Sequence, residues 1–406
     1  MMLCLWLLLL FCHGGVLGIA ALPPPLPSLL PEPLVLPPLP PPPPAEQQSR
    51  NGYIVKLKRG ISSHDFLEQS QSLQADERPD IKHVYNTTDF QGFAAQLSPD
   101  ELEELKNDFY VDYVEQETPV RLAVVQPNAP GWGLPRICRR ERILDRSRPH
   151  PYVYEDAGGA GVDIFVIDTG VNDKLAEFGG RARHLGSFVP GEPNTDIQGH
   201  GTLVAGVVGA NTYGVAKRAR IYGLKVMDKN GDGTSSAVVA AIQYVTSVAR
   251  PGKTIINLSV TSGRSRAIDD ATEAAVRAGV VVIVAAGNER TNACEESPPA
   301  APHAFAVAAS DGDDRHAAYS NYGPCVRMYA PGSDIRSLGL DGRVAVQSGT
   351  SMAAPFVAGT AAIFMSMYSF KDAGGVYAML LNRATRNALT GVRRDTPNRL
   401  VYSLSK

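Results

Sequence analysis

Short, nearly uninterrupted apolar segments alternate with helix-like segments in the C-terminal two thirds of this 406-residue chain. The clearest apolar segment is Val280-Val-Val-Ile-Val-Ala-Ala286, which has no polar face. A strand of this kind is buried on both sides, as in a parallel sheet with helices on each face. The pattern therefore predicts an α/β domain with a mostly parallel central sheet. Its expected elements are 162–168, 200–209, 220–226, 236–249, 254–259, 268–278, 280–285 and 350–368.

The first fifty residues have a different character. Residues 3–12 form an apolar core followed by small residues, a pattern typical of a signal peptide, and we expect residues 1–20 to be removed. A membrane anchor is the alternative, but the run is too short for one. Residues 21–50 are rich in proline, which favours an extended polyproline spacer. A ligand for a proline-binding module is the alternative interpretation.

Residues 51–123 are expected to form a small α+β domain, and residues 124–406 the larger α/β domain. The helix that starts at Ser98 opens with Ser-Pro-Asp-Glu, which is a strong helix-start signal. The order of elements predicts two helices on one face of an antiparallel sheet. The expected strands are 53–57, 90–97 and 111–115, and the expected helices are 63–73 and 98–106.

Charge and cysteine content exclude several classes of partner. The net charge is −2 and the basic residues form no stripe, so we expect neither nucleic acid nor a membrane as partner. Beyond the predicted signal peptide only Cys138, Cys294 and Cys325 remain, and no pair of them has zinc-site spacing. An odd number leaves at least one thiol unpaired, or paired with another chain.

Three motifs fall at the ends of the predicted elements. Alone, each has an ordinary explanation: an Asp in a turn, a His in a glycine loop, a Ser that caps a helix. Together, in the order Asp, His, Ser, they match a known catalytic triad order. Asp168 lies in Val166-Ile-Asp-Thr-Gly170, His200 in Gly199-His-Gly-Thr202, and Ser351 in Gly349-Thr-Ser-Met-Ala-Ala-Pro355.

From residue 51 onward the chain resembles the subtilisin-like serine proteases (the peptidase S8 family), most closely the proteinase K-type branch. The resemblance implies a subtilisin-like three-layer fold and a serine endopeptidase. His200 would take the proton of the Ser351 hydroxyl, and Asp168 would hold the imidazole in the required tautomer. Asn288, in Ala285-Ala-Gly-Asn288, would donate a side-chain hydrogen bond to the oxyanion.

The resemblance also implies where substrate binds. An extended peptide would lie between segments 257–260 and 230–233, and the primary specificity pocket between 259–261 and 285–287. The family usually has two glycines after the position of Val260, whereas this chain has Thr261 and Ser262, which would narrow the pocket. No carboxylate stands out there, so we expect uncharged substrate side chains. The implied substrate-binding residues are Gly231, Gly233, Ser259, Val260, Thr261, Ala286 and Gly287.

By the same resemblance, residues 51–123 are an inhibitor I9-type propeptide of ferredoxin-like fold, with self-cleavage between Glu117 and Val125. A binding domain that stays attached is the alternative. Cys294 and Cys325 stand where relatives carry a disulfide, the alternative being two buried thiols, and Cys138 has no evident partner. Asn86 lies in a glycosylation sequon; a second sequon, at Asn257, should be protected by folding.

The chemistry itself needs no cofactor. The resemblance to the family does, however, raise the question of a structural calcium ion. The family's tight site uses carbonyl oxygens near Pro302 and Ala304 and an Asp side chain, and Arg327 stands in place of that Asp. A guanidinium cannot ligate a cation, so we expect this site to be lost. The nearby acidic residues 311, 313 and 314 are expected to form a solvated loop and not a substitute site.

The sequence thus predicts a secreted, monomeric, self-processing serine endopeptidase that acts on proteins and peptides and is inhibited by its own propeptide. A catalytically silent relative is a second hypothesis, which the complete triad argues against. A lipase or esterase of the α/β-hydrolase class would need Ser, Asp, His order and a Gly-x-Ser-x-Gly elbow, and Ser351 has neither.

Overall fold

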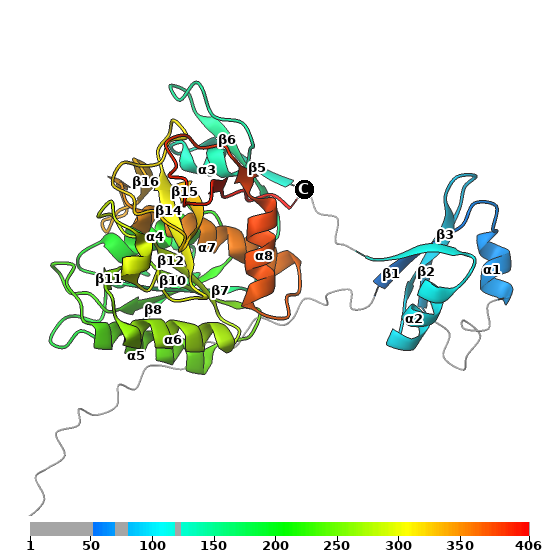
Figure 1. Cartoon of the computed structure of the whole chain (residues 1–406), viewed down its shortest axis with the longest axis horizontal. Helices are drawn as coiled ribbons and strands as arrows, with labels where there is room; N and C mark the ends of the chain where they lie inside the picture. The colour runs from blue at the N-terminus through cyan, green and yellow to red at the C-terminus, as the bar shows by residue number, and fades with distance from the viewer. Residues whose placement is uncertain (1–51, 70–79, 118–122, 406) are drawn as a thin grey trace, which may run out of the picture. The chain divides into compact units, whose positions relative to one another are not determined.

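The computed structural model describes residues 52–69, 80–117 and 123–405 (Figure 1). The predicted signal peptide (1–20) and the Pro-rich spacer (21–50) lie outside the described residues. The same holds for most of the segment in which self-cleavage is expected, because residues 118–122 are also outside them.

The small N-terminal domain is an antiparallel sheet of order β2-β3-β1-β4 with two helices. Phe66 of one helix and Leu105 of the other pack with Val55 and Phe93 of the sheet in one core, so both helices cover the same face, as predicted. Only the exposed edge strand β2 was not predicted. The elements are β1 (Gly52–Leu57), α1 (Ser63–Gln69), β2 (Asp80–Asn86), β3 (Gln91–Gln96), α2 (Pro99–Asn107) and β4 (Val111–Gln116).

The start of α2 shows how local sequence fixes an element of this domain. The Ser98 side chain accepts from the Glu101 N–H at 3.2 Å, and Glu101 Oε2 accepts from the Ser98 N–H at 2.6 Å. This reciprocal capping box satisfies two backbone donors that a helix start leaves unpaired. Pro99 follows at the first helical position, where its missing N–H costs nothing.

A nine-stranded sheet organises the larger domain, and every strand pair except β18–β19 is parallel. The mostly parallel sheet inferred from the apolar segments is therefore confirmed. In spatial order the strands are β18 (Thr385–Arg386), β19 (Arg399–Leu400), β15 (Val326–Pro331), β14 (Phe305–Ser310), β12 (Val281–Ala285), β10 (Thr254–Leu258), β7 (Asp163–Asp168), β9 (Arg220–Lys225) and β8 (Ala182–Ser187).

Alternate side chains of each central strand pack into two separate cores. In β7, Ile164 and Val166 join the core under α4, α7 and α8, whereas Phe165 and Ile167 join the core under α5 and α6. The helices therefore cover both faces of the sheet, as Figure 1 shows. The helices are α3 (Gly133–Ile137), α4 (His200–Gly209), α5 (Ser235–Val248), α6 (Arg266–Arg277), α7 (Thr350–Met367) and α8 (Ala373–Arg383), with 3₁₀ turns η2 (Ala176–Phe178) and η3 (Ala293–Glu295).

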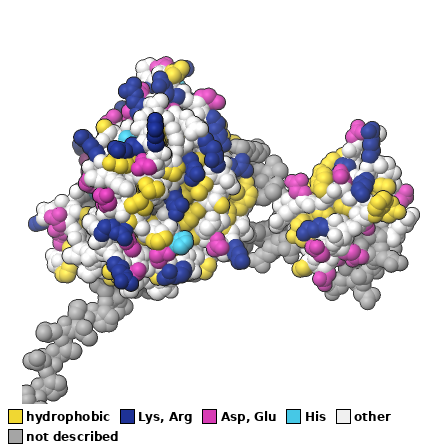
Figure 2. Space-filling model, viewed as in Figure 1, with side chains coloured by type: hydrophobic (Ala, Val, Ile, Leu, Met, Phe, Trp, Pro, Cys, Tyr) yellow, Lys and Arg dark blue, Asp and Glu magenta, His cyan; other side chains and the backbone are white. Residues whose placement is uncertain are grey.

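Helix α7 runs through the centre of this domain. It is long and apolar enough to cross a membrane, but 89% of its apolar window is buried inside the domain, which identifies it as a core helix. Three two-stranded ribbons complete the fold: β5 (Ala123–Ala129) with β6 (His150–Glu155), β11 (Ser262–Gly263) with β13 (Glu296–Ser297), and β16 (Ile335–Leu338) with β17 (Val344–Gln347). On the face seen in Figure 2, acidic and basic side chains are interspersed.

Candidate active site

The carboxyl ends of four neighbouring parallel strands (β12, β10, β7 and β9) meet at one edge of the sheet. Asp168 is the last residue of β7, and the segments that follow the other three strands are the predicted substrate-binding segments. This is the edge at which ligands bind in open parallel sheets, because loops from adjacent strands converge there.

Asp168 and His200 are in direct contact. The buried Asp168 carboxylate accepts from Nδ1 of His200 at 2.7 Å through Oδ1, which also accepts from the Thr169 N–H at 2.7 Å. His200 is the first residue of α4, so the helix sets the position of its ring. An imidazole that donates through Nδ1 has its Nε2 free to accept a proton, which is the tautomer that a general base needs.

A third acidic residue, Asp196, holds the loop that leads into α4. Its Oδ1 accepts from Thr169 Oγ1 at 2.9 Å and from the Gly199 N–H at 2.8 Å. Its Oδ2 accepts from the N–H and the hydroxyl of Thr202, at 2.9 and 2.6 Å. This buried carboxylate ties the residues before and after His200 to the end of β7. Sequence reasoning missed it, although an acidic residue four positions before a glycine-flanked His was visible.

The same acidic groups set the basicity of His200. Burial lowers the pKa of His200, but the charge and hydrogen bond of Asp168, with a smaller contribution from Asp196, leave the pKa raised above its ordinary value of 6.5. A raised pKa makes the imidazole a stronger base once it is neutral.

Ser351 is the second residue of α7, and its carbonyl group has an unusual partner. In a regular helix that carbonyl would accept from the N–H of residue 355, but Pro355 has none. Ser259 Oγ donates to the Ser351 carbonyl instead, at 2.8 Å, and Asn257 Nδ2 donates to Ser259 Oγ at 2.9 Å. The start of α7 is thereby bonded to the segment that follows β10.

Asn288 follows β12 and faces the same helix start. Its Oδ1 accepts from the N–H and the hydroxyl of Thr350, at 2.8 and 3.1 Å. The N–H groups of its Nδ2 take no part in these two bonds. A Cβ built on Gly349 would lie 2.8 Å from Ser351 Oγ and 3.7 Å from both Ser351 N and Asn288 Nδ2. The Ser351 hydroxyl and two N–H donors therefore lie near one point, which a side chain at position 349 would fill.

The predicted walls of the specificity pocket lie beside each other. Segment 259–261 follows β10, and segment 285–287 begins at the last residue of β12. The two strands are paired in parallel, with Asn257 opposite Ile283. Both segments are bonded to the start of α7, the second through the Gly287 N–H to Thr350 Oγ1 at 3.1 Å.

Sequence reasoning missed Glu296, which lies between these segments. Asn257 is fully buried, as expected for a sequon protected by folding.

Gly231 and Gly233 lie in a tight turn after β9. The Asp228 N–H donates to the Asp232 carbonyl at 2.8 Å, and Gly231 has a positive φ of 86° that favours glycine. Gly233 is bridged to Met227. The turn leaves the sheet at the same edge as Asp168.

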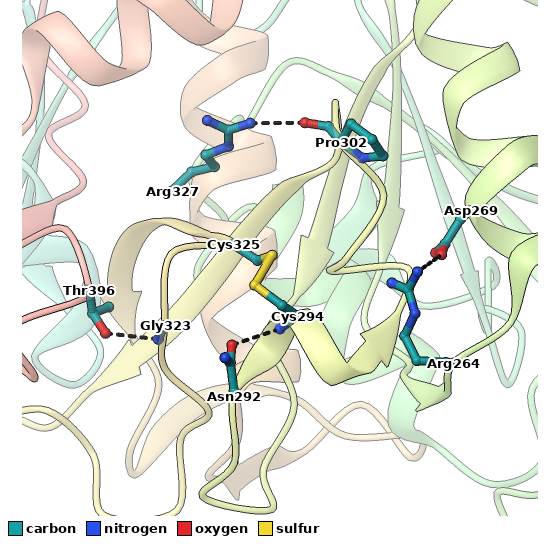
Figure 3. The surroundings of a disulfide bond; sticks show 9 residues. All are labelled: Arg264, Asp269, Asn292, Cys294, Pro302, Gly323, Cys325, Arg327 and Thr396. Atoms are coloured by element: carbon teal, nitrogen blue, oxygen red, sulfur yellow. Dashed lines mark hydrogen bonds and ion pairs between the residues drawn. A yellow bond between two sulfur atoms is a disulfide. The ribbon is translucent and has the colours of Figure 1, made fainter.

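The Cys294–Cys325 disulfide that the resemblance implied is present, and it joins η3 to the start of β15 (Figure 3). Cys138 is a buried free thiol. Asn86 ends β2 and is exposed.

Arg327 is the residue that the resemblance places at a calcium-ligand position, and its contacts test whether a cation would fit there. Its Nη2 donates to the Pro302 carbonyl at 2.9 Å (Figure 3), so the guanidinium engages one of the carbonyl groups attributed to the family's tight site. A cation would be repelled at this position, and the residues present do not fit it. Within the described residues, no cluster of three or more His, Cys, Asp or Glu side chains is placed to hold a metal ion.

The expectation of a solvated acidic loop nearby is wrong for Asp314. This carboxylate is buried and accepts from Arg136 Nε and Nη2, both at 2.9 Å, whereas Asp313 pairs with Arg146 at the surface. A buried carboxylate needs such a partner because an isolated charge loses its hydration.

Comparison with known proteins agrees with this geometry. Residues 159–398 match the Subtilase family, and residues 52–123 match the family described as Peptidase inhibitor I9. The chain is 37% identical to the subtilisin-like serine protease AsES of Sarocladium strictum, over 87% of this chain and 89% of that protein. It is also 37% identical to a cuticle-degrading protease of Metarhizium anisopliae, over 92% and 93% of the two chains.

The crystal structure of a cold-adapted subtilisin-like serine proteinase superimposes with a TM-score of 0.65 at 39% identity, covering 69% of this chain and all of that one. The paired Asp168 and His200, the Ser351 hydroxyl at a helix start and the two N–H donors near it thus lie on a fold shared with known proteases. The chain belongs to the subtilase family and is a serine endopeptidase that carries an I9-type propeptide.

Proposed function

We propose that the chain is a secreted, self-processing endopeptidase in which Asp168, His200 and Ser351 act as the triad. The observation that carries this proposal is the 2.7 Å contact between His200 Nδ1 and Asp168, together with the convergence of donors beside Ser351. The chemistry needs no cofactor. The bond from Arg327 to the Pro302 carbonyl supports the proposal that the family's tight calcium site is absent from this protein.

The catalytic steps follow from these positions. Ser351 Oγ attacks the substrate carbonyl carbon while its proton passes to His200 Nε2. The oxyanion so formed receives hydrogen bonds from Asn288 Nδ2 and the Ser351 N–H. His200 then protonates the leaving amine. In the second half of the reaction, water attacks the acyl carbon while its proton passes to His200, and the Ser351 oxygen leaves and takes that proton back. Throughout, Asp168 stabilises the imidazolium and stays ionised.

The N-terminal domain is proposed to inhibit the enzyme until it is cut off between Glu117 and Val125. A match to an inhibitor family over residues 52–123 supports this role. Its sheet and loops expose large apolar side chains, including Phe109 at 77% exposure, which is unusual for a domain that functions alone. Secretion is supported by the apolar segment 3–12 and by the disulfide, which an oxidising compartment preserves.

Ser351→Ala tests the proposal. In a host without other proteases, the variant should remain an uncut precursor and should lose peptide hydrolysis by up to about 10⁶-fold. The wild type should be labelled by a fluorophosphonate probe, which requires an activated Ser, and Ser351→Ala should not. A wild-type protein that is neither cut nor labelled would instead identify a catalytically silent relative.

The sequence-based expectation of uncharged substrate side chains depended on the absence of a carboxylate from the specificity pocket. That expectation stays a prediction, and the Glu296 carboxylate, which lies beside Gly287, argues for the opposite preference.

A further inference from the structure

Glu296 lies between the two segments expected to form the specificity pocket. On one side, β11 and β13 pair so that Gly263 is opposite Glu296, and the Thr261 side chain is near enough to the Glu296 carboxylate to lower its pKa. On the other side, a Cβ built on Gly287 would lie 2.5 Å from Glu296 Oε2. The carboxylate therefore touches both walls, which are themselves bonded to the start of α7.

Asn321 fixes the direction of this carboxylate. Its Nδ2 donates to Glu296 Oε1 at 2.7 Å and to the Ala286 carbonyl at 3.0 Å, and its Oδ1 accepts from the Glu289 N–H at 3.0 Å. Oε1 is thus held by the protein, whereas Oε2 is directed toward the glycine wall. The Glu296 side chain is only half-buried, so part of it remains open to solvent. The disulfide anchors η3 directly before Glu296 (Figure 3).

A second carboxylate faces the same wall. Glu289 Oε2 would lie 2.9 Å from the Cβ built on Gly287. Among the described residues, no Lys or Arg lies within 4.0 Å of either Glu289 or Glu296, and the nearby Arg264 is held by Asp269 at 3.1 Å (Figure 3). Burial and the adjacent Glu289 raise the pKa of Glu296, while Asn321 and Thr261 oppose the rise. A cation placed between the two carboxylates would relieve this like-charge contact.

Building on the proposed function, we propose that Glu296 determines specificity and makes the pocket a site for a basic side chain. The residue concerned is the acyl-side residue, whose carbonyl carbon Ser351 attacks. A Lys ammonium offers three donors and an Arg guanidinium five, all able to bond to a carboxylate. An apolar side chain would instead desolvate both carboxylates and leave them with amide and backbone donors but no cationic partner. Glu289 supports the same preference from the neighbouring position.

The test uses peptide substrates that differ only at the acyl-side residue. Lysine is compared with norleucine and arginine with citrulline, because each pair differs mainly in charge. We expect the wild type to have a higher kcat/KM for the charged member of each pair. In Glu296→Gln the charged-to-neutral ratio should fall roughly 10- to 100-fold, the usual worth of a hydrogen bond to a charged group.

Glu295→Gln is the matched control, because it removes the same charge from an exposed neighbour. It should leave the ratio unchanged. If Glu296 only braced the walls, its loss would lower kcat/KM for charged and neutral substrates alike, and the ratio would not move. That result overturns the proposal, as does an equal fall in Glu295→Gln.

The wild type alone provides a second measurement that does not depend on a variant folding. Its cleavage sites in a denatured protein, mapped by mass spectrometry, should lie mostly after Lys and Arg. Cleavage that avoids these residues overturns the specificity proposal while the endopeptidase stands. A protein that cleaves no substrate at all contradicts the proposed function instead.

Discussion

Removing the Cys294–Cys325 disulfide should destabilise the catalytic domain by an amount that loop length sets. The two cysteines are 31 residues apart. For a loop of this length the chain-entropy relation gives about 12 cal/mol/K, or ~3.7 kcal/mol at 25 °C, by which the crosslink stabilises the folded state. At about 2.1 cal/mol/K of unfolding entropy per residue, a domain of this size should then lose roughly 6 °C in Tm.

Unfolding is best followed in the Ser351→Ala background, where autolysis is absent. The chain has two tryptophans, Trp6 in the predicted signal peptide and Trp132 in the catalytic domain. Trp132 is buried and its Nε1 donates to the Ser333 carbonyl at 2.9 Å, so its fluorescence in the exported protein reports unfolding of that domain. Guanidinium titrations of the parent and of the double Cys294→Ser, Cys325→Ser variant give the difference in free energy of unfolding.

Dithiothreitol supplies the control. It should lower the stability of the parent to that of the double variant and leave the double variant unchanged, since the remaining thiol, Cys138, is buried and bonded to no other cysteine. A difference below about 1 kcal/mol, or an equal effect of reductant on both proteins, would refute the loop-entropy reasoning.

Four further predictions concern the active site and the expected absence of a tight calcium site near Arg327. Because only neutral His200 is a base and its pKa is raised, kcat/KM should rise with pH through a midpoint above 6.5; Asp168→Asn, which removes the acceptor, should lower kcat by about 10⁴-fold. A pH profile that is flat between about 6 and 8 contradicts this. Asn288→Ala should lower kcat by roughly 10²- to 10³-fold with little change in KM, and an effect confined to KM would exclude an oxyanion role. EDTA should not change the Tm of the Ser351→Ala protein; a large rise with calcium that persists in Arg327→Ala would show a strong site elsewhere.

The positions of the three proposed triad residues were predictable because each stands inside a short motif at the end of a strongly patterned element. Asp168 follows an apolar strand, and His200 and Ser351 open apolar helices, so local sequence alone brings them to element ends. The contact between Asp168 and His200 was implied by the parallel strands, because their carboxyl ends and the segments that follow them share one edge.

Glu296 was not predictable in the same way. It belongs to no motif, and it reaches the pocket because the chain after Asn288 turns back over Asn321 and is tied down at Cys294. Asp314 illustrates the same limit, because its partner Arg136 is 178 residues away in the sequence. Strand β14 was also missed; its sequence, FAVAAS, is rich in alanine, which by itself favours helix.

The proline in α7 has a consequence for how this protease can evolve. Pro355 leaves the Ser351 carbonyl without its helical donor, and Ser259 bonds to it instead. Position 259 therefore supports the proposed nucleophile and also lies in the proposed substrate-binding segment. A substitution at position 259 would disturb Ser351 whatever the substrate. Few substitutions should therefore be tolerated there when substrate specificity changes. Thr261 and Glu296 carry no such bond to α7 among the contacts of the described residues. Changes in substrate range should therefore accumulate at these two positions, where the charge of the pocket can be altered while the nucleophile keeps its support.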